Sequence, residues 1–138
     1  MNQFGFRSRH STIHAVLSIV DKIQQAIENN QFSCRVFLDL SKAFDTVNHN
    51  ILLQKLEHYG IRGLALDWFK SYLTNRKKYT EIVSYISSLN DIHFGVPQGS
   101  VLGPVLFLLY INDFNYSSLT LTFNIFADDS NIFCSDKN

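Results

Sequence analysis

An apolar pattern of helical spacing, followed directly by a short strand-like run, constrains the fold more than any other feature of the sequence. From Ser11 or Thr12 to Asn30, apolar residues recur every three or four positions, which is the period of an amphipathic α-helix. The run 32–40 is rich in apolar and β-branched residues and is too short for another helix. We interpret it as a buried strand that ends near Asp39. A helix joined at once to a strand predicts a fold that contains a sheet.

The rest of the chain alternates between helix-like and strand-like segments. Beyond residue 40 we predict helices over 51–59, 64–73 and 104–114, one hairpin over 79–86 and 89–96 with a short polar turn, and a second hairpin over 119–127 and 130–134. Gly60 ends the first of these helices, and Pro104 fits the first turn of the last. The second hairpin carries Asp128 and Asp129 at its tip. This order of elements predicts an α+β fold.

The composition agrees with a mixed fold. The 138 residues are 46% hydrophobic, which is enough for one sizeable core, so we expect a single globular unit. Charged residues make up 17%, while 12 Phe and 6 Tyr favour aromatic packing on a sheet. The formal net charge is zero and gives no indication of a polyanionic partner. We interpret the basic cluster of Lys70 and 76–78 as a solvated helix end, with contact to phosphates as the alternative.

The sequence indicates an intracellular chain without a membrane span. The longest apolar stretch, 101–111, is too short to cross a bilayer and contains Gly103 and Pro104. The start of the chain lacks the basic residues and apolar core of a signal peptide. We therefore expect Cys34 and Cys134 to be reduced, and we interpret both as small buried residues.

Asp39 is the carboxylate whose position most suggests chemistry. It follows the apolar run 36–38, so the strand would carry its side chain from the core to the edge of the sheet. If that strand lies beside the second hairpin, Asp39 meets Asp128 and Asp129, and like charges so close require a cation. Oxygen ligands select a hard ion such as Mg²⁺, and two ions about 3.5–4 Å apart can activate a 3′-hydroxyl and hold pyrophosphate. The three aspartates therefore indicate nucleotidyl transfer.

Four short motifs follow one another along the chain: QFGFRSRHST over 3–12, FLDLSKAFD over 37–45, GVPQGSVLGP over 95–104 and FADD over 126–129. The first resembles a fingers motif of LINE-type (non-LTR retrotransposon) and group II intron reverse transcriptases. The second and third resemble their first catalytic motif and second palm motif, and the last is similar to their Tyr-x-Asp-Asp motif. The order is that of the family, and the resemblance covers nearly the whole chain.

The resemblance implies a reverse-transcriptase palm, a ferredoxin-like βαββαβ fold, with part of the fingers. Residues 1–31 would be partial fingers, and residues 32–138 the palm with an inserted fingers-side segment. The remaining fingers, the last palm motifs, the thumb and an endonuclease domain are expected elsewhere in a full-length element. We therefore expect this chain to be a fragment of such a polymerase.

The resemblance also implies a metal site. Asp39 and Asp128 would bind two Mg²⁺ ions, for which Mn²⁺ can substitute. The backbone carbonyl of Leu40 would help on the nucleotide side, and Asp129 would be the third carboxylate. Together these oxygens would form the catalytic centre.

A nucleotide pocket is implied next to the metals. Phe44 falls where the family places a bulky ring under the incoming sugar, which would exclude a 2′-hydroxyl; an ordinary core Phe is the alternative. Gln98 and Gly99 match positions that line this pocket, because Gly allows close backbone approach and the amide can donate to sugar or base. A turn role would explain the 97–99 stretch almost as well.

Two arginines and two residues before the paired aspartates complete the implied site. Arg7 and Arg9 are candidates to bind the triphosphate, with solvent exposure as the alternative, and the sequence does not rank them. Phe126 and Ala127 would lie at the primer and template. Phe126 replaces the usual Tyr and so lacks its hydroxyl, which leaves only the ring for packing.

These residues favour an RNA-directed DNA polymerase of a non-LTR retrotransposon, which would use an RNA template, a DNA primer and deoxynucleoside triphosphates (dNTP) in the nucleus. A second interpretation is a truncated retroelement remnant without catalytic activity. A third, another palm enzyme such as a nucleotide cyclase, needs a different nucleotide pocket. Phe44 and the 97–99 stretch argue against that third class.

Overall fold

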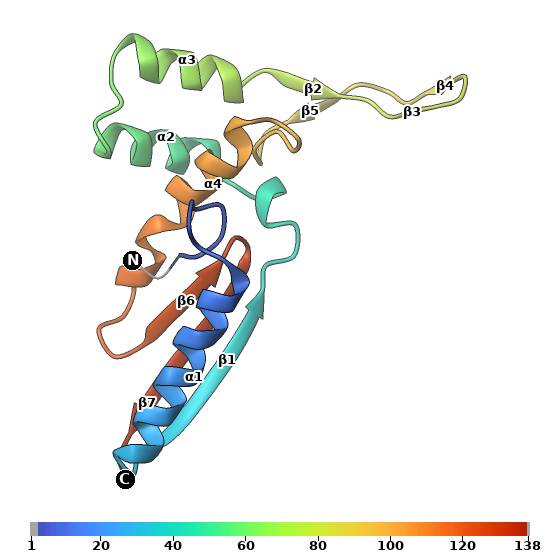
Figure 1. Cartoon of the computed structure of the whole chain (residues 1–138). Helices are drawn as coiled ribbons and strands as arrows, with labels where there is room; N and C mark the ends of the chain where they lie inside the picture. The colour runs from blue at the N-terminus through green and yellow to red at the C-terminus, as the bar shows by residue number, and fades with distance from the viewer. Residues whose placement is uncertain (1–2, 138) are drawn as a thin grey trace. The chain divides into compact units, whose positions relative to one another are not determined.

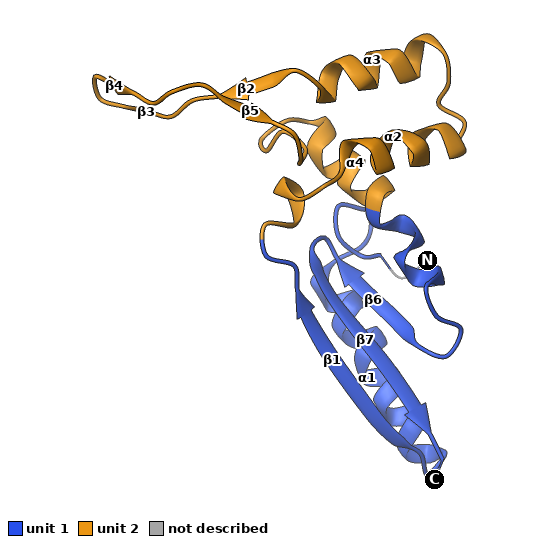
Figure 2. Cartoon of the chain, turned by 180° about the vertical axis from the view of Figure 1, so that it is seen from behind, with its two compact units in different colours: residues 1–41, 111–138 blue, residues 42–110 orange. Residues whose placement is uncertain are grey.

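The computed structural model describes residues 3–137 of the chain. The chain forms two compact units, and the second is inserted into the sequence of the first. Unit 1 comprises Met1–Ser41 and Ile111–Asn138, and unit 2 comprises Lys42–Tyr110 (Figure 2). The single compact unit that we expected is thus divided, because composition reports how much core a chain can build and not where its contacts are concentrated.

Unit 1 is a three-stranded antiparallel sheet with the helix α1 packed against β1 and β6 (Figure 1). Its elements are α1 Thr12–Glu28, β1 Phe32–Asp39, the 3₁₀ segment η2 Asn112–Tyr116, β6 Thr122–Phe126 and β7 Asp129–Asp136. The strand order is β1-β7-β6, and β1 pairs with β7 along its whole length. The helix and strand predicted at the start of the chain are confirmed.

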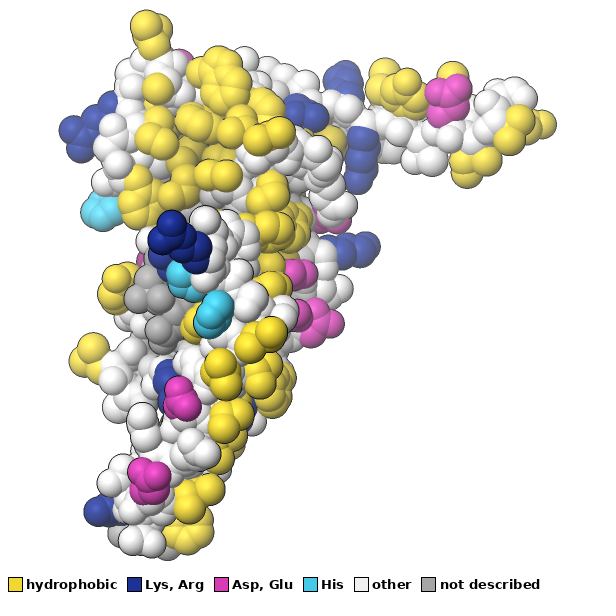
Figure 3. Space-filling model, viewed as in Figure 1, with side chains coloured by type: hydrophobic (Ala, Val, Ile, Leu, Met, Phe, Trp, Pro, Cys, Tyr) yellow, Lys and Arg dark blue, Asp and Glu magenta, His cyan; other side chains and the backbone are white. Residues whose placement is uncertain are grey.

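The helix α1 buries its small residues and exposes its large apolar ones. Ala15 and Ala26 are 9% and 2% exposed. The residues that we call the α1 apolar row are each at least 36% exposed: Ile13, Val16, Leu17, Val20, Ile23 and Ile27. Figure 3 shows yellow side chains along the part of the molecule where α1 runs. The amphipathic pattern therefore marks a face that unit 1 leaves accessible.

Strand β1 is an edge strand and not the buried strand that we predicted. Phe32 and Phe37 are each 72% exposed, and Val36 is 47% exposed. Within residues 3–137, β1 pairs with β7 alone. An apolar, β-branched run is typical of a strand covered on both faces. The same run at the edge of a sheet leaves several of its side chains accessible to solvent.

The two cysteines lie opposite each other in unit 1. Cys34 on β1 and Cys134 on β7 are Cα partners in the strand register. Both are free thiols, and Cys34 is exposed while Cys134 is half-buried. The interpretation of both as buried residues was wrong, because it followed from residue type alone: Cys34 lies on the edge strand, and Cys134, on the central strand, is only partly covered.

Unit 2 packs helices around an apolar core and carries a two-stranded ribbon (Figure 1). Its elements are η1 Ala43–Asp45, α2 His49–His58, α3 Leu64–Leu73, β2 Arg76–Lys78, β3 Glu81–Ile82, β4 Tyr85–Ile86, β5 Asn90–Ile92 and α4 Leu102–Ile111. The core residues that are at most 2% exposed are Val47, Leu52, Leu56, Leu73, Leu106 and Phe107. The predicted helices are confirmed, and Pro104 lies in the first turn of α4.

The ribbon of unit 2 turns at a different place from the one that the sequence indicated. Strands β3 and β4 pair so that the turn consists of Val83 and Ser84, not of the polar residues 87–88 that we expected. Ser87 instead continues the ribbon, since its N–H donates to the Thr80 carbonyl at 2.9 Å. The hairpin itself is confirmed.

The structure confirms the α+β class. In residues 3–137 the main sheet has three strands, so the complete βαββαβ palm stays a prediction, as does the division into residues 1–31 and 32–138. Residues 76–78 form strand β2, and their interpretation as a helix end was wrong because α3 already ends at Leu73. No helix in the described part of the chain is long and apolar enough to cross a membrane.

Candidate active site

The β6–β7 hairpin turns through two residues, Ala127 and Asp128. Phe126 pairs with Asp129 across the base of the turn, so Asp129 is the first residue of β7. We had predicted that Asp129 lies at the tip of the hairpin. Ala127 has a φ of +58°, in the left-handed region that non-glycine residues rarely adopt. The favoured two-residue hairpin turns need a positive φ to match the twist of the strands. The hairpin is confirmed, and its turn begins at Ala127.

The strand register brings the predicted catalytic aspartates to one end of the sheet. Asp39, the last residue of β1, lies opposite Asp129, the first residue of β7. Directly opposed residues of an antiparallel pair project their side chains on the same face. Asp128 lies next to Asp129 in the turn and is half-buried, whereas Asp39 and Asp129 are exposed. The structure therefore places the end of β1 beside the hairpin tip, as the sequence predicted.

The carboxylate oxygens at this end of the sheet are the kind of ligand that a hard divalent ion prefers. The three aspartate side chains do not, however, converge on a common site. No three acidic, His or Cys side chains among residues 3–137 are close enough together to hold a metal ion. Carboxylates without a cation between them repel one another. Leu40, whose carbonyl is a further candidate ligand, follows Asp39 directly and is 38% exposed. The metal site therefore stays a prediction, and only the type of its oxygen ligands suits such an ion.

A buried segment at the start of the chain lies against the turn of Ala127 and Asp128, which we call the active turn. Gln3 forms a parallel bridge with Ile125, and the Phe4 N–H donates to the Ile125 carbonyl at 2.7 Å. The Gln3 Oε1 accepts a hydrogen bond from the Ala127 N–H at 3.1 Å. Sequence reasoning included Gln3 in the fingers motif but gave it no role, because its partner lies 124 positions away.

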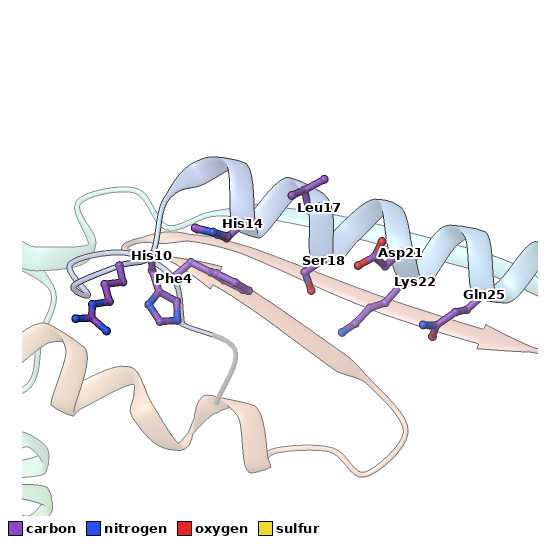
Figure 4. Close-up of a pocket in the computed structure, with 9 residues that line it drawn as sticks. Phe4, His10, His14, Leu17, Ser18, Asp21, Lys22 and Gln25 are labelled. Carbon is purple, nitrogen blue, oxygen red and sulfur yellow. The ribbon is translucent and has the colours of Figure 1, made fainter.

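The two candidate arginines differ in their surroundings. Both side chains are exposed, but the Arg7 Nη1 already donates to the Gln3 carbonyl at 3.3 Å. Arg9 lines an open groove of about 480 Å³ between residues 4–10 and α1 (Figure 4). Lys22 also lines this groove. Burial, and then repulsion from Arg35, lower the pKa of Lys22. Arg9 is therefore the better placed of the two to meet an external anion.

In unit 2, the loop that carries Gln98 is joined by hydrogen bonds to the segment that carries Phe44. The Val96 N–H donates to the Phe44 carbonyl at 2.8 Å, and the His49 Nε2 lies 2.7 Å from the Gly95 carbonyl. Gly95 has a φ of +90°, and a Cβ there would lie 2.8 Å from the Asp45 Cα. Sequence reasoning missed His49, which is 7% exposed and fixes this loop. The segments that carry Phe44 and Gln98, which are distant in sequence, are thus neighbours.

The side chains of these candidates have partners of their own. The Phe44 ring stacks on Phe107 with centroids 4.4 Å apart and is half-buried, so it is both a core residue and partly accessible. The Gln98 Nε2 donates to the Asp45 Oδ1 at 2.9 Å. A Cβ at Gly99 would meet no atom within 4 Å. Their roles toward a nucleotide stay predictions.

Gln98 also lines a groove of about 470 Å³ in unit 2. Three basic residues, Lys42, Arg76 and Lys78, line the same groove. The groove therefore combines the candidate amide with an excess of positive charge, which suits a phosphate-bearing ligand.

Comparison with known proteins agrees with the geometry. Residues 1–138 match the family described as "Reverse transcriptase (RNA-dependent DNA polymerase)". The chain is 36% identical over 135 residues to the "Probable RNA-directed DNA polymerase from transposon X-element" of Drosophila melanogaster, a match that covers 93% of this chain. It is 40% identical over 111 residues to the "RNA-directed DNA polymerase from mobile element jockey" of the same species, covering 80% of this chain.

A more distant match is the "Retrovirus-related Pol polyprotein from type-1 retrotransposable element R2" of Popillia japonica, with 39% identity over 80 residues and 56% of this chain covered. These relatives are much longer proteins. The matched region amounts to 14%, 12% and 13% of the X-element, jockey and R2 proteins, respectively.

Proposed function

Because the chain belongs to the reverse transcriptase (RNA-dependent DNA polymerase) family, we propose that it carries the catalytic carboxylates of an RNA-directed DNA polymerase of a non-LTR retrotransposon. The observation that supports this activity best is the strand register: Asp39 lies opposite Asp129, with Asp128 beside it in the turn. The family that the motifs indicated is confirmed. The chemistry of each residue is the proposal.

Asp39 and Asp128 are proposed to hold two divalent ions, with the Leu40 carbonyl and Asp129 as further oxygen ligands. Bound Mg²⁺ or Mn²⁺ would supply Lewis-acid activation of a primer 3′-hydroxyl and charge stabilisation at the leaving pyrophosphate. The carboxylates would hold these charges in place and so would position a primer 3′-hydroxyl in line with the α-phosphate of a dNTP. The exposure of Asp39 and Asp129 supports this role, because ligands of a metal that meets both substrates must be accessible.

The remaining candidate residues are proposed to bind the nucleotide. The half-buried Phe44 ring would exclude a 2′-hydroxyl, and the open surface over Gly99 would admit the nucleotide close to the backbone. Gln98 would have to exchange its bond to Asp45 for one to the nucleotide. Arg9 and, less directly, Arg7 would meet the triphosphate.

The proposal extends to the substrates and the cellular setting. Phe126 and Ala127, at the turn, would lie on the side of the RNA template and DNA primer. A ferredoxin-like palm would be completed by other parts of a longer polymerase, and an active element would work in the nucleus.

Primer extension on an RNA template with Mg²⁺ and dNTP tests the proposed activity, with Mn²⁺ binding followed by paramagnetic broadening of amide signals in NMR spectra as a second readout. Asp39→Asn should lower extension by about 10³-fold, since a lost metal ligand removes several kcal/mol of transition-state stabilisation. It should also weaken Mn²⁺ binding.

Asp136→Asn is the matched control, because Asp136 ends the same strand pair opposite Phe32, far from the turn. It should leave both readouts unchanged. Equal Mn²⁺ binding by wild type, Asp39→Asn and Asp136→Asn would refute the proposed metal site. Ion binding at Asp39 without extension would favour a remnant that keeps the site but not the activity.

A further inference from the structure

The active turn contains a residue in an unfavourable backbone conformation. Ala127 has a φ of +58° and is 8% exposed. Only glycine, and to a lesser degree Asn and Asp, adopts this region without a steric penalty, so an alanine remains there only where its surroundings hold it. The conformation of Ala127 determines the direction in which the next residue, Asp128, leaves the strand.

The Gln3 side chain binds the backbone of this residue. Its Oε1 accepts hydrogen bonds from the Ala127 N–H at 3.1 Å and from the Gly5 N–H at 2.8 Å. Its Nε2 lies 3.5 Å from the Ala127 carbonyl oxygen. Two N–H donors near one end of the amide require that end to be the oxygen, so the chemistry fixes the orientation. Gln3 is 2% exposed and therefore satisfies these groups where water does not reach.

The neighbours of Gln3 keep this contact close. A Cβ at Gly5 would lie 2.3 Å from the Ala127 backbone nitrogen, so any larger residue would push the two segments apart. The Phe4 N–H donates to the Ile125 carbonyl at 2.7 Å, which ties the segment to β6 just before the turn. We call residues 3–5 the brace.

We infer that Gln3 is a positioning residue for nucleotidyl transfer: it holds Ala127 in the left-handed conformation and thereby directs the Asp128 carboxylate toward the metal ions. The catalytic part of this inference rests on the proposed function. The structural part does not, because it concerns the backbone of Ala127 alone. The fingers motif would then act on the chemistry through the main chain and not only by contact with the nucleotide.

The test uses the full 138-residue chain and two readouts, hydrogen exchange of backbone amides and Mn²⁺ binding, both followed by NMR. Gln3→Met keeps the length of the side chain but removes both polar atoms. Exchange of the Ala127 amide should rise about threefold to tenfold, the effect of one lost hydrogen bond, while amides in the middle of β7 keep their protection. Mn²⁺ binding should weaken by a similar factor.

Two further variants separate positioning from general stability. Gln24→Met makes the same replacement at an exposed position of α1 and should change neither readout. In the A127G background, Gln3→Met should weaken Mn²⁺ binding by less than about twofold, because glycine adopts a positive φ without a brace. A structural role of Gln3 alone would not be suppressed in this way.

Three results would overturn the inference: unchanged exchange at Ala127 in Gln3→Met, equal loss of protection throughout β6 and β7, or a Gln3→Met effect on Mn²⁺ binding as large in the A127G background as with Ala127 present. Failure of the proposed function has another signature. In that case Asp128→Asn would not alter Mn²⁺ binding, while the exchange at Ala127 would still respond to Gln3→Met.

Discussion

The two hairpins of this chain turn in the same way and are held by different means. Val83 in unit 2 and Ala127 in unit 1 each occupy the first position of a two-residue turn, with φ of +57° and +58°. Val83 is 91% exposed, whereas Ala127 is 8% exposed and bonded to Gln3. The comparison shows that the same strained backbone conformation can occur in an exposed turn and in a turn that buried hydrogen bonds hold in place.

The difference lies in what surrounds each turn. The tip of the ribbon is closed by β3 and β4, which pair through two residues each. The active turn ends the longer strands β6 and β7 and is packed against the brace. Turns fixed by contacts distant in sequence can orient a side chain for chemistry. The tip of the ribbon has no such contact among the hydrogen bonds of the described residues.

The largest expected effect comes from placing asparagine at the second position of the active turn, with the same residue placed in the ribbon turn as the control. Asp128→Asn should abolish Mn²⁺ binding at the turn and lower primer extension by about 10³-fold, because it removes a metal ligand. Ser84→Asn, at the same position of the exposed turn, should leave both unchanged. Similar losses in the two variants would break the comparison.

The next effect concerns the space between the brace and the turn. Gly5→Ala should lower the free energy of unfolding, measured by urea denaturation, by about 3 kcal/mol, since a Cβ would meet the Ala127 backbone at 2.3 Å. Gly60→Ala is the control: its φ is +93° but its surroundings are open, so a loss of about 1 kcal/mol is expected. A smaller loss at Gly5 than at Gly60 would mean that the brace is loosely packed.

Glycine at the two strained positions should stabilise both hairpins, but by different amounts. Val83→Gly should stabilise the ribbon by about 1 kcal/mol, because it removes the strain of a positive φ at a β-branched residue. The gain should be measurable as slower hydrogen exchange of the amides in β3 and β4. Ala127→Gly should stabilise its hairpin less, because a positive φ costs alanine less than a β-branched valine and because the change removes a methyl group from a residue that is only 8% exposed. Equal gains would indicate that the Ala127 methyl group contributes no packing at the active turn.

The smallest effect on the active turn is expected from a crosslink far from it. Opposed residues of antiparallel strands have Cα atoms about 4.5–5.5 Å apart, within the range of a disulfide. Mild oxidation should therefore join Cys34 to Cys134 within one chain, detected as faster migration on a non-reducing gel, and should change Mn²⁺ binding by less than about twofold. Cys34→Ser should abolish the shift. Failure to crosslink would place the β1–β7 register in question.

The local spacing of apolar residues predicted the helices and strands well, but it did not predict the contacts between residues distant in sequence. The helix from Thr12 and the strand to Asp39 follow from spacing alone, because a helix face and a β-run are properties of neighbouring residues. The exposure of β1 does not follow from spacing, since it depends on which strands pair with it.

The candidate site shows the same division. The adjacency of Asp39 and Asp129 was predicted because the motifs indicated a strand beside a hairpin tip. The turn was placed one residue too late, since Ala127 has the composition of a strand residue and a positive φ is not visible in an alanine. Gln3 received no role because only the folded chain brings its amide to Ala127.

The apolar row of α1 has a practical consequence. Beside it, β1 presents an edge that pairs with β7 alone within residues 3–137, so backbone groups on its other side can meet another chain. Apolar surface and an open strand edge are both features that favour association with another chain, so we expect NMR line widths to increase with protein concentration. At the concentrations used for NMR, self-association would compete with ion and substrate binding. Dilution is therefore the first control in every measurement on this chain.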